Sequence, residues 1–332
     1  MKKIKIGLVG TGTVAQTYAQ VFQSSHLCSL VAVADIREDV AKSFAEPFSA
    51  KVFTSYEKLA ESGLVDAVIV ATPPSTHFPV AKAFMERQIH VLCEKPLCLS
   101  RAEALQMISL ASEKKIVFTM ASKFRYASDV IKAKSIISSG ALGEIIQFEN
   151  YFTCSVDMSK RWNSDKKISG GGVLIDNGTH SVDIIRYILG EIEEVIAVET
   201  GKVHDLEVEE NVRLLAKTRC GVVAVVDLAW GVDKKIPDFI RIYGTNGVLC
   251  VGWRESKYRT YSSSNWVIFG KGYDKLKAFR AKVENFCKAI LGKEKLLIDV
   301  EDALASVEVI EAAYNSLRQN LWQKVRPFSV AR

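Results

Sequence analysis

A glycine-rich loop near the start of the sequence could hold a phosphate group. Residues 10–15 read Gly-Thr-Gly-Thr-Val-Ala, directly after an aliphatic run and at the start of a helical pattern. Gly10 permits a tight turn, and Gly12 lets the backbone approach a pyrophosphate without a Cβ in the way. Thr13 and Val14 then open the helix, whose N-terminus attracts an anion. This arrangement predicts a dinucleotide-binding loop.

An acidic residue at the end of the next aliphatic run indicates which nucleotide the loop would bind. Asp35 lies 20 residues beyond Ala15, a spacing typical of the carboxylate that accepts hydrogen bonds from ribose hydroxyls. Since the same carboxylate would repel a 2′-phosphate, the sequence favours NAD over NADP. Arg37 keeps NADP open, because it could neutralise a 2′-phosphate as well as stack on adenine. The alternative is that Asp35 is a solvated turn residue.

A lysine follows a later strand pattern. Glu94-Lys95-Pro96 comes directly after the aliphatic run His90–Cys93. If that run belongs to a parallel sheet, Lys95 lies at the sheet's carboxyl edge, where ligands bind. Its ammonium could donate a hydrogen bond to a substrate oxygen. An isolated tripeptide of this kind would equally fit an ordinary surface loop.

A second glycine-rich segment precedes a run of ionisable side chains. Three glycines, Gly170–Gly172, could let the backbone approach a ligand closely. If 174–189 is helical, Asp176, His180, Asp183 and Tyr187 share one face. A carboxylate one turn from a histidine can orient the ring and stabilise its charged form, as a proton-transferring pair requires.

Two other interpretations of this segment stay open. His180 could be a core histidine held by Asp176, or both could bind a metal together with Asp183. We predict no metal, because no further histidine or cysteine lies at ligand spacing nearby.

The elements that would position these residues form two domains. Up to about residue 120, β-branched runs alternate with amphipathic helical stretches, which predicts a doubly wound parallel sheet of the α/β class. The expected strands are Ile4–Val9, Leu30–Ala34, Ala67–Ala71, His90–Cys93 and Ile116–Thr119. The expected helices are Val14–Ser24, Asp39–Phe44, Tyr56–Glu61, Thr76–Arg87 and Arg101–Glu113, the last with a capping box from Ser100 to Glu103.

The remainder of the chain predicts an α+β domain on an open, mainly antiparallel sheet. The expected strands are Ile145–Phe152, Val195–Val203, Val212–Lys217, Gly221–Trp230, Phe239–Tyr243 and Val248–Gly252, and the expected helices are Asp274–Leu291 and Val300–Leu317. Asn246-Gly247 predicts a hairpin turn between the last two strands. We therefore expect domains at 1–122 and 123–332, with C-terminal helices that could pack back on the first. The apolar run Val222–Trp230 predicts a strand that is covered on both faces, which favours a subunit contact, although a helix of the same chain would cover it equally well.

Composition excludes several classes of protein. The 332 residues are 48% hydrophobic and 25% charged, with few glycines and prolines, which excludes collagen-like and disordered chains. No apolar run is long enough to span a membrane, and the net charge of +6 is too dispersed to favour nucleic acid. Seven cysteines without a C-x-x-C pair indicate reduced thiols. We expect a cytoplasmic protein with neither a membrane nor a nucleic-acid partner.

Taken together, the three motifs resemble those of the Gfo/Idh/MocA family, the group of glucose–fructose oxidoreductase and inositol dehydrogenase. They are the nucleotide loop, Glu94-Lys95-Pro96, and Gly170-Gly-Gly-x-x-x-Asp176-x-Gly178-x-His180, and the resemblance covers essentially the whole chain. It implies a Rossmann domain followed by an open-sheet domain. It also implies hydride transfer between NAD(P) and a hydroxyl or ketone carbon of a sugar, sugar derivative or cyclitol, in a homodimer or homotetramer.

The resemblance further implies roles for individual residues. Lys95, Asp176 and His180 would be catalytic and contact the substrate, and the Lys95–Pro96 bond would be cis. The implied cofactor contacts are the nucleotide loop, Asp35 and Arg37, and in addition Thr72, Pro73, His77, Glu94 and Lys95. Arg125, Arg161 and Trp162 lie where relatives place substrate loops and would suit a sugar bearing a phosphate or carboxylate, although solvated basic loops explain the region as well.

Two other functions fit the same fold. One is a non-catalytic NAD-binding regulator, although such relatives tend to lose the lysine or the histidine that this sequence retains. The other is a glycosidase that uses NAD for transient oxidation of its substrate.

Overall fold

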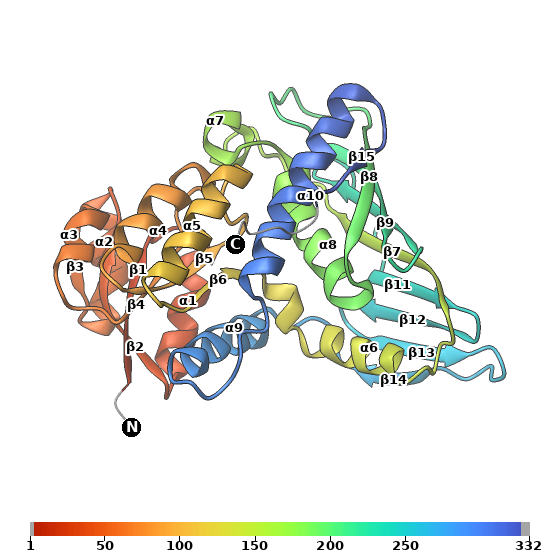
Figure 1. The fold of residues 1–332 in the computed structure, drawn as a ribbon, viewed down its shortest axis with the longest axis horizontal. Coiled ribbons are helices and arrows are strands. Elements are labelled where there is room, and N and C mark those ends of the chain that lie inside the picture. Colours follow the sequence, from red (N-terminus) through yellow and green to blue (C-terminus); the bar gives the residue numbers. More distant parts are fainter. Residues whose placement is uncertain (1–2, 327–332) are drawn as a thin grey trace. The chain divides into compact units, whose positions relative to one another are not determined.

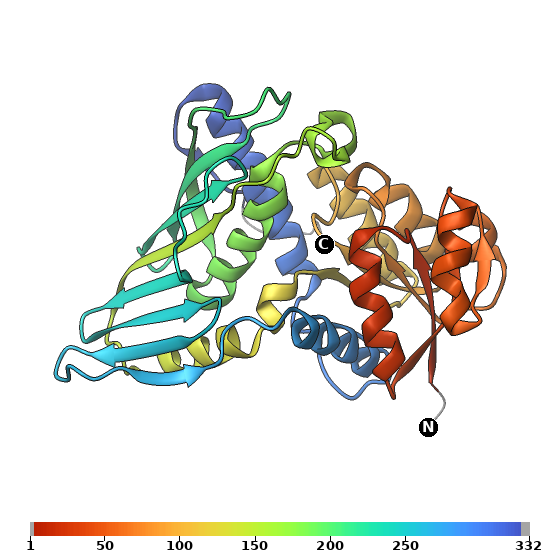
Figure 2. The same ribbon diagram turned by 180° about the vertical axis from the view of Figure 1, so that it is seen from behind.

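The computed structural model describes residues 3–326 and divides the chain into two units, each built around its own sheet (Figures 1 and 2). The first unit joins the chain up to Lys123 to the later segment Leu276–Leu304. The second joins Phe124–Lys275 to the chain from Ala305 on. No helix of the described residues is both long and apolar enough to cross a membrane.

The first unit contains the parallel sheet that the sequence predicts. In sheet order its strands are β3 (Lys51–Phe53), β2 (Cys28–Ala34), β1 (Ile4–Val9), β4 (Ala67–Val70), β5 (His90–Glu94) and β6 (Phe118–Ala121). All of the pairings are parallel. β3 was not expected, because its three residues are exposed or half-buried and so carry no continuous apolar run.

Helices of the first unit follow the expected order. They are α1 (Thr13–Ser24), α2 (Glu38–Ala45), α3 (Tyr56–Glu61), α4 (His77–Met85) and α5 (Arg101–Glu113), with short 3₁₀ turns at Glu46–Phe48 and Pro74–Thr76. The capping of α5 is confirmed, since the Ser100 Oγ accepts from the Glu103 N–H at 3.2 Å. At the other end Lys115 has φ +52°, and the Ile116 N–H donates to the Ala111 carbonyl. Ile116 therefore closes the helix, and β6 begins two residues later than we expected.

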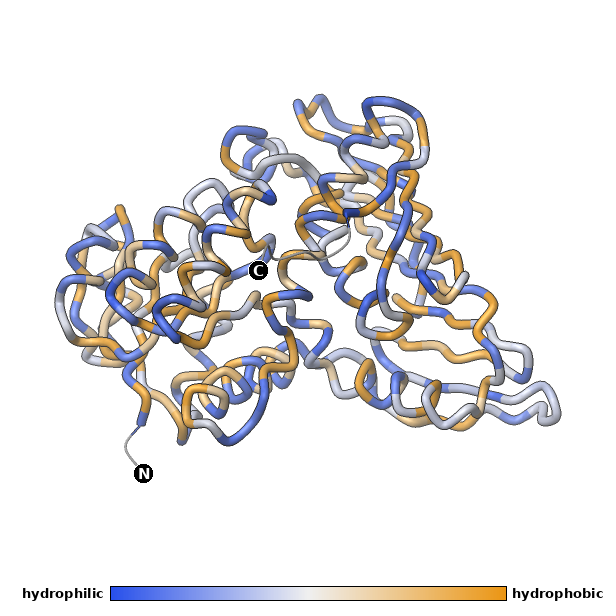
Figure 3. The backbone as a smooth tube through the Cα atoms, viewed as in Figure 1, coloured by the Kyte–Doolittle hydropathy of each residue, from blue (hydrophilic) through white to orange (hydrophobic). Residues whose placement is uncertain are grey.

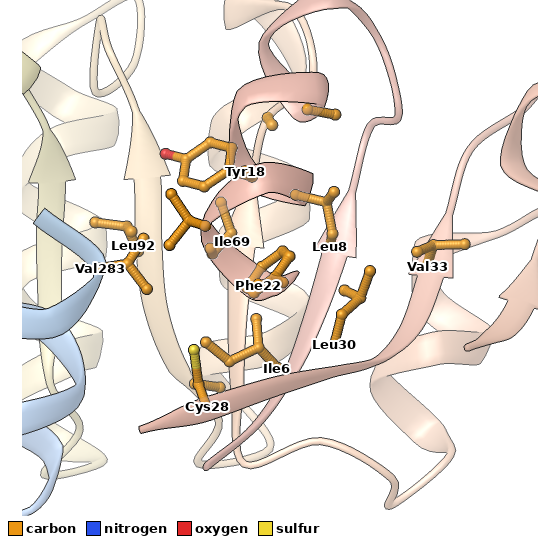
Figure 4. Close-up of a cluster of buried hydrophobic side chains, with 14 of the residues drawn as sticks. Ile6, Leu8, Tyr18, Phe22, Cys28, Leu30, Val33, Ile69, Leu92 and Val283 are labelled. Atoms are coloured by element: carbon orange, nitrogen blue, oxygen red, sulfur yellow. The ribbon is translucent and has the colours of Figure 1, made fainter. Parts of the chain in front are cut away.

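A helix from late in the sequence completes the core of the first unit. α9 (Lys275–Ile290) buries Phe279, Val283 and Phe286, each at most 2% exposed. Figure 4 shows Val283 beside Leu92 of β5, within the cluster that contains Tyr18 of α1. The rings of Tyr18 and Phe279 lie 5.1 Å apart.

The second unit is built on a nine-stranded sheet. In sheet order its strands are β14 (Val267–Gly270), β13 (Ser256–Thr260), β12 (Gly247–Gly252), β11 (Asp238–Gly244), β7 (Ile145–Thr153), β10 (Val223–Ala229), β9 (Asn211–Thr218), β8 (Ile192–Glu199) and β15 (Gln323–Lys324). Only β7 and β10 pair in parallel. The predicted hairpin at Asn246-Gly247 is confirmed. β13 was missed because its sequence is polar, and β14 was missed although it is apolar, because it has only four residues.

Helices cover one face of this sheet. The helices of the second unit are α6 (Ser128–Ser138), α7 (Lys166–Ser169), α8 (Val173–Leu189) and the part of α10 (Val300–Gln319) from Ala305 on, with 3₁₀ turns at Lys123–Tyr126 and Trp162–Ser164. Hydrophobic and hydrophilic residues alternate along several strands (Figure 3). On β9, Leu214 is fully buried whereas its neighbour Leu215, which points to the other face, is half-buried.

Candidate active site

The glycine turn after β1 has the geometry that a phosphate loop needs. Gly10 has φ +91°, and a Cβ there would lie 2.6 Å from the Ala71 carbonyl oxygen. Only glycine fits such a position without strain. Gly12 caps α1 without a side-chain hydrogen bond, and a Cβ at Gly12 would meet nothing within 4 Å. The start of α1 is therefore left without a side-chain cap, as a helix N-terminus that binds an anion would be.

Asp35 ties this turn to the end of β2. Its Oδ2 accepts from the backbone N–H of Thr11 at 2.8 Å and from the Thr11 hydroxyl at 2.9 Å, and its Oδ1 accepts from the Arg37 N–H at 3.0 Å. Burial raises the pKa of Asp35, but these hydrogen bonds outweigh it and leave the pKa below its ordinary value. The carboxylate is thus ionised at neutral pH and able to accept further hydrogen bonds.

These features fit a dinucleotide. The open space at Gly12 and the start of α1 would take the pyrophosphate, and the Asp35 carboxylate would take ribose hydroxyls. Arg37 is exposed, and its side chain lies 3.4 Å from Asp35. Arg37 is therefore placed to contact the same ribose of the nucleotide as Asp35.

The loop after β4 is anchored by a buried histidine. Thr72 and Pro73 are half-buried, but His77 is only 1% exposed. Its Nδ1 lies 2.7 Å from the Pro96 carbonyl oxygen and its Nε2 lies 2.8 Å from the Thr72 carbonyl oxygen. Burial lowers the pKa of His77, so the ring is neutral and can donate to one of the two carbonyls. His77 therefore joins two loops, and its contact with the cofactor stays a prediction.

β5 ends at Glu94, and the Lys95–Pro96 bond that follows is in the cis form. Lys95 is half-buried, whereas Glu94 is 8% exposed. The Glu94 carboxylate is directed into the core, where it accepts from Tyr18 and Lys282. Glu94 therefore supports Lys95 from the interior, and its contact with the cofactor stays a prediction.

In the second unit, the glycines before α8 are needed for packing within the protein. A Cβ at Gly171 would lie 1.8 Å from the Tyr314 hydroxyl, and one at Gly172 would lie 1.9 Å from the Glu209 carbonyl oxygen. Our interpretation that these glycines approach a ligand is wrong. Their small size admits Glu209 and Tyr314 to the start of the helix.

Glu209 caps α8. Its Oε1 accepts from the backbone N–H groups of Gly172 at 2.8 Å and Leu174 at 3.1 Å, and from the Tyr314 hydroxyl at 2.7 Å. The Glu209 carbonyl accepts from the Val173 N–H at 2.9 Å. These bonds satisfy N–H groups that every helix start leaves unpaired. They fix the helix that carries Asp176 and His180.

Asp176 and His180 lie one turn apart on α8, as predicted. Asp176 is half-buried and His180 is 4% exposed. The His180 imidazole packs against Phe124, with ring centroids 5.0 Å apart, and lies 6.3 Å from the ring of Phe152. Trp253 extends this aromatic group and is 40% exposed. Such apolar walls limit the motion of the imidazole.

Arg125 takes a position that differs from our expectation. It is 3% exposed, and its Nη2 lies 2.6 Å from Asp183 Oδ1. Its guanidinium also lies over the Tyr187 ring. If Arg125 moved away from Asp183 to bind a substrate, the buried carboxylate would lose its counter-charge. This pairing therefore argues against direct contact of Arg125 with the substrate. Arg161 and Trp162, by contrast, are exposed.

Two parts of the sequence match one family. The domain described as "Oxidoreductase family, NAD-binding Rossmann fold" matches residues 4–122, and the GFO/IDH/MocA C-terminal domain matches residues 130–250. The chain belongs to the Gfo/Idh/MocA oxidoreductase family. The resemblance expected from the three motifs is confirmed, and so is the NAD-binding Rossmann domain at the N-terminus.

Relatives of this family member include sugar dehydrogenases. Glucose-6-phosphate 3-dehydrogenase of Bacillus subtilis is 32% identical over 190 residues, and the chain spans only about half (53%) of that enzyme's length. The rhizopine catabolism protein MocA of Rhizobium meliloti is 25% identical over 325 residues, 97% of each chain. A solved levoglucosan dehydrogenase in complex with NADH has the same fold, with a TM-score of 0.90 at 21% identity over 98% of this chain and 100% of that one.

Four residues that support the family motifs were missed by sequence reasoning. Tyr18 and Lys282 hold Glu94, and Glu209 and Tyr314 hold the start of α8. Each contact joins residues more than 30 positions apart. The only signal in the sequence is the adjacent pair of acidic residues at 209–210, before a strand.

We predict that Gly172→Ala destabilises the protein by at least about 2 kcal/mol, because the added Cβ would force the start of α8 away from Glu209. Urea unfolding followed by circular dichroism would measure the change. Gly201→Ala is the matched control, since a Cβ there meets nothing within 4 Å, and it should change stability by about 0.5 kcal/mol or less. Equal effects of the two substitutions would contradict the packing role of Gly172.

Proposed function

We propose that the protein is an NAD-dependent dehydrogenase that acts on a CH–OH group of a sugar, sugar derivative or cyclitol, or on the corresponding ketone. The observation that carries the proposal is the carboxyl edge of the first sheet. There the turn at Gly10–Thr13, the ionised Asp35 and Lys95 follow three strands of one sheet. This edge combines a dinucleotide site with a cation suited to a substrate oxygen.

Bound NAD would supply the hydride acceptor. The side chains would transfer the hydroxyl proton and stabilise the negative charge on the reacting oxygen. The Lys95 ammonium donates a hydrogen bond to the reacting oxygen and stabilises its developing negative charge. His180 removes the hydroxyl proton during oxidation and returns it during reduction. Asp176, one turn earlier on α8, orients the imidazole and stabilises its protonated form.

Sugar-like substrates are supported by relatives and by exposed side chains. Glucose-6-phosphate 3-dehydrogenase and levoglucosan dehydrogenase, which resemble this chain, are named for sugar substrates. Arg161 is exposed and could bind a phosphate or carboxylate, and Trp162, 44% exposed, could stack on a sugar ring. We propose both as substrate contacts.

The proposal includes a cytoplasmic location. Five of the seven cysteines are buried as free thiols (Cys28, Cys93, Cys98, Cys250 and Cys287), and the remaining two are also free. Buried thiols of this kind suit a reducing compartment.

Lys95→Ala and His180→Ala should each lower kcat by about 10²-fold or more, because each removes a group that acts on the reacting oxygen. NADH absorbance with a panel of sugars, sugar phosphates and cyclitols would measure kcat, and fluorescence titration would measure NAD affinity, which should change little. Lys42→Ala, on the exposed side of α2, is the control. Retention of near-full turnover by both variants would contradict the assignment. Release of a glycoside leaving group without net NADH would indicate the glycosidase instead.

Asp35→Asn should weaken NAD binding and move the preference toward NADP by about ten-fold or more, because it removes the charge that repels a 2′-phosphate while Arg37 stays. Competition between the two cofactors in fluorescence titration would measure the shift. The pKa of Asp35 is lowered in the folded protein, so its ionisation stabilises the fold above the ordinary pKa and that contribution is lost as pH falls through the folded pKa. The variant should therefore be less stable than wild type at neutral pH but not in strong acid. An unchanged cofactor preference would contradict the role of Asp35.

We also propose that the uncovered face of the nine-stranded sheet binds a second copy of the chain. Ile196, Leu215 and Val225 form one row across β8, β9 and β10, and all three are half-buried on that face. Glu149 and Arg241 continue the row with opposite charges. A two-fold pairing would bury the apolar part and could match the charged parts.

Leu215→Lys should therefore convert the protein from an oligomer into a monomer, because an ammonium would be buried without a partner in the apolar row. Sedimentation velocity at several concentrations would measure the change. Lys58→Glu, exposed on α3 of the first unit, is the control for a change of surface charge and should keep the oligomer. A wild-type protein that sediments as a monomer would overturn the proposed contact.

A further inference from the structure

Glu94, which ends β5, is held by side chains from two helices far apart in the sequence. Its Oε1 accepts a hydrogen bond of 2.6 Å from the Tyr18 hydroxyl in α1 and one of 2.9 Å from the Lys282 ammonium in α9. Its Oε2 accepts from the backbone N–H of Lys95 at 3.3 Å. The carboxylate thus connects the core of the first unit to the backbone of Lys95.

The ammonium of Lys282 is an unusual group for this core. Its side chain is 0% exposed, and its Nζ lies 3.9 Å from the centre of the Phe279 ring and 4.8 Å from that of Tyr18. A buried ammonium needs a counter-charge, and Glu94 supplies one. A pair of apolar residues would fill the same space without the cost of burying charge. The pair therefore points to a role beyond stability.

We propose that Lys282, together with Tyr18, is a positioning residue that keeps the Glu94 carboxylate fixed and charged and thereby holds Lys95 for the reaction. This inference rests on the proposed function, because it requires Lys95 to bind the reacting oxygen. Two donors on one carboxylate oxygen fix the plane of the group, so the other oxygen stays on the Lys95 N–H.

A second anchor holds the far side of the same turn. The Pro96 carbonyl oxygen lies 2.7 Å from His77 Nδ1. The Lys95 backbone is therefore held before the side chain by Glu94 and after it by His77. Both contacts act on the backbone, one on either side of the half-buried Lys95 side chain.

The charge of Glu94 depends on groups from several elements. Those that face it are Tyr18 of α1, His77 of α4, Cys93 and Lys95 of its own segment, and Lys282 of α9. Burial raises the pKa of Glu94, and Lys282, Tyr18 and Lys95 together bring it below the ordinary value. If Lys282 is removed, burial keeps its full effect and the pKa rises. As pH falls through that raised pKa, Glu94 gains a proton and loses acceptor capacity.

Lys282→Met in the full-length protein tests the inference. Relative to wild type at the same pH, its kcat should approach equality at about pH 9 and fall about ten-fold or more by about pH 6, an acid limb additional to any that the proton transfer itself gives both proteins. The double variant Lys282→Met, Glu94→Gln should show no such limb, because it contains no titrating carboxyl. NAD affinity, measured by fluorescence titration, should stay within about three-fold of wild type, because the nucleotide loop is untouched.

Three further variants keep the test decisive. Lys288→Met, on the same helix but with a side chain 37% exposed and paired with Glu294 at 2.6 Å, is the matched control and should keep the wild-type pH profile. Lys282→Arg retains the charge and should also keep it. If Lys282→Met fails to fold, Tyr18→Phe removes one donor from the same oxygen and should produce a weaker acid limb.

The outcomes separate this inference from the proposed function. If the wild-type enzyme is active and Lys282→Met or Tyr18→Phe has the same pH profile as wild type, the positioning role alone is overturned. A uniform loss of kcat at every pH in Lys282→Met would indicate a merely structural residue and would also overturn it. No turnover by wild type on the whole substrate panel would contradict the proposed function, and this inference with it.

Discussion

The parallel register of the first sheet is the constraint on which the candidate site depends. Val9 is opposite both Ala34 and Val70, and Val70 is opposite Cys93. β1, β2 and β4 therefore end at the same level and β5 ends one residue further, at Glu94, so the residue that follows each strand reaches the same edge. Gly10, Asp35 and Lys95 come together for this reason, although up to 85 positions separate them. The chemistry of each residue is evident from its own short motif, but the sheet register determines that the three lie at one edge.

Sequence patterns were most informative where a local rule decides the structure. The glycine turn, the capping box at Ser100 and the one-turn spacing of Asp176 and His180 each depend on a few neighbouring residues, and each is present in the structure. Strands with an apolar run or regular alternation were also predicted. β13 was not, because Ser256–Thr260 packs through a polar sequence that shows no such pattern.

Contacts between distant segments could not be predicted in the same way. The glycines at 171 and 172 indicate only that something approaches closely, and the sequence does not say whether this is a ligand or Glu209. Lys282 lies in an amphipathic helix, where a lysine is ordinarily solvated. Only the packing of α9 reveals that its ammonium faces Glu94. The pairing of Arg125 was not foreseen for the same reason, since its partner Asp183 is 58 positions away. In each case a long-range partner determines whether a polar side chain binds a ligand or supports the fold.

The return of Leu276–Leu304 to the first unit has a consequence for biosynthesis. A nascent chain synthesised through Lys123 contains every strand of the parallel sheet but lacks α9, so the surface that Phe279, Val283 and Phe286 later cover is still exposed. More than 150 further residues must leave the ribosome before that surface can be closed. During this interval the nascent sheet presents an apolar patch to chaperones and to other chains. The rate of translation across the second unit thus sets how long the nucleotide-binding unit remains without α9.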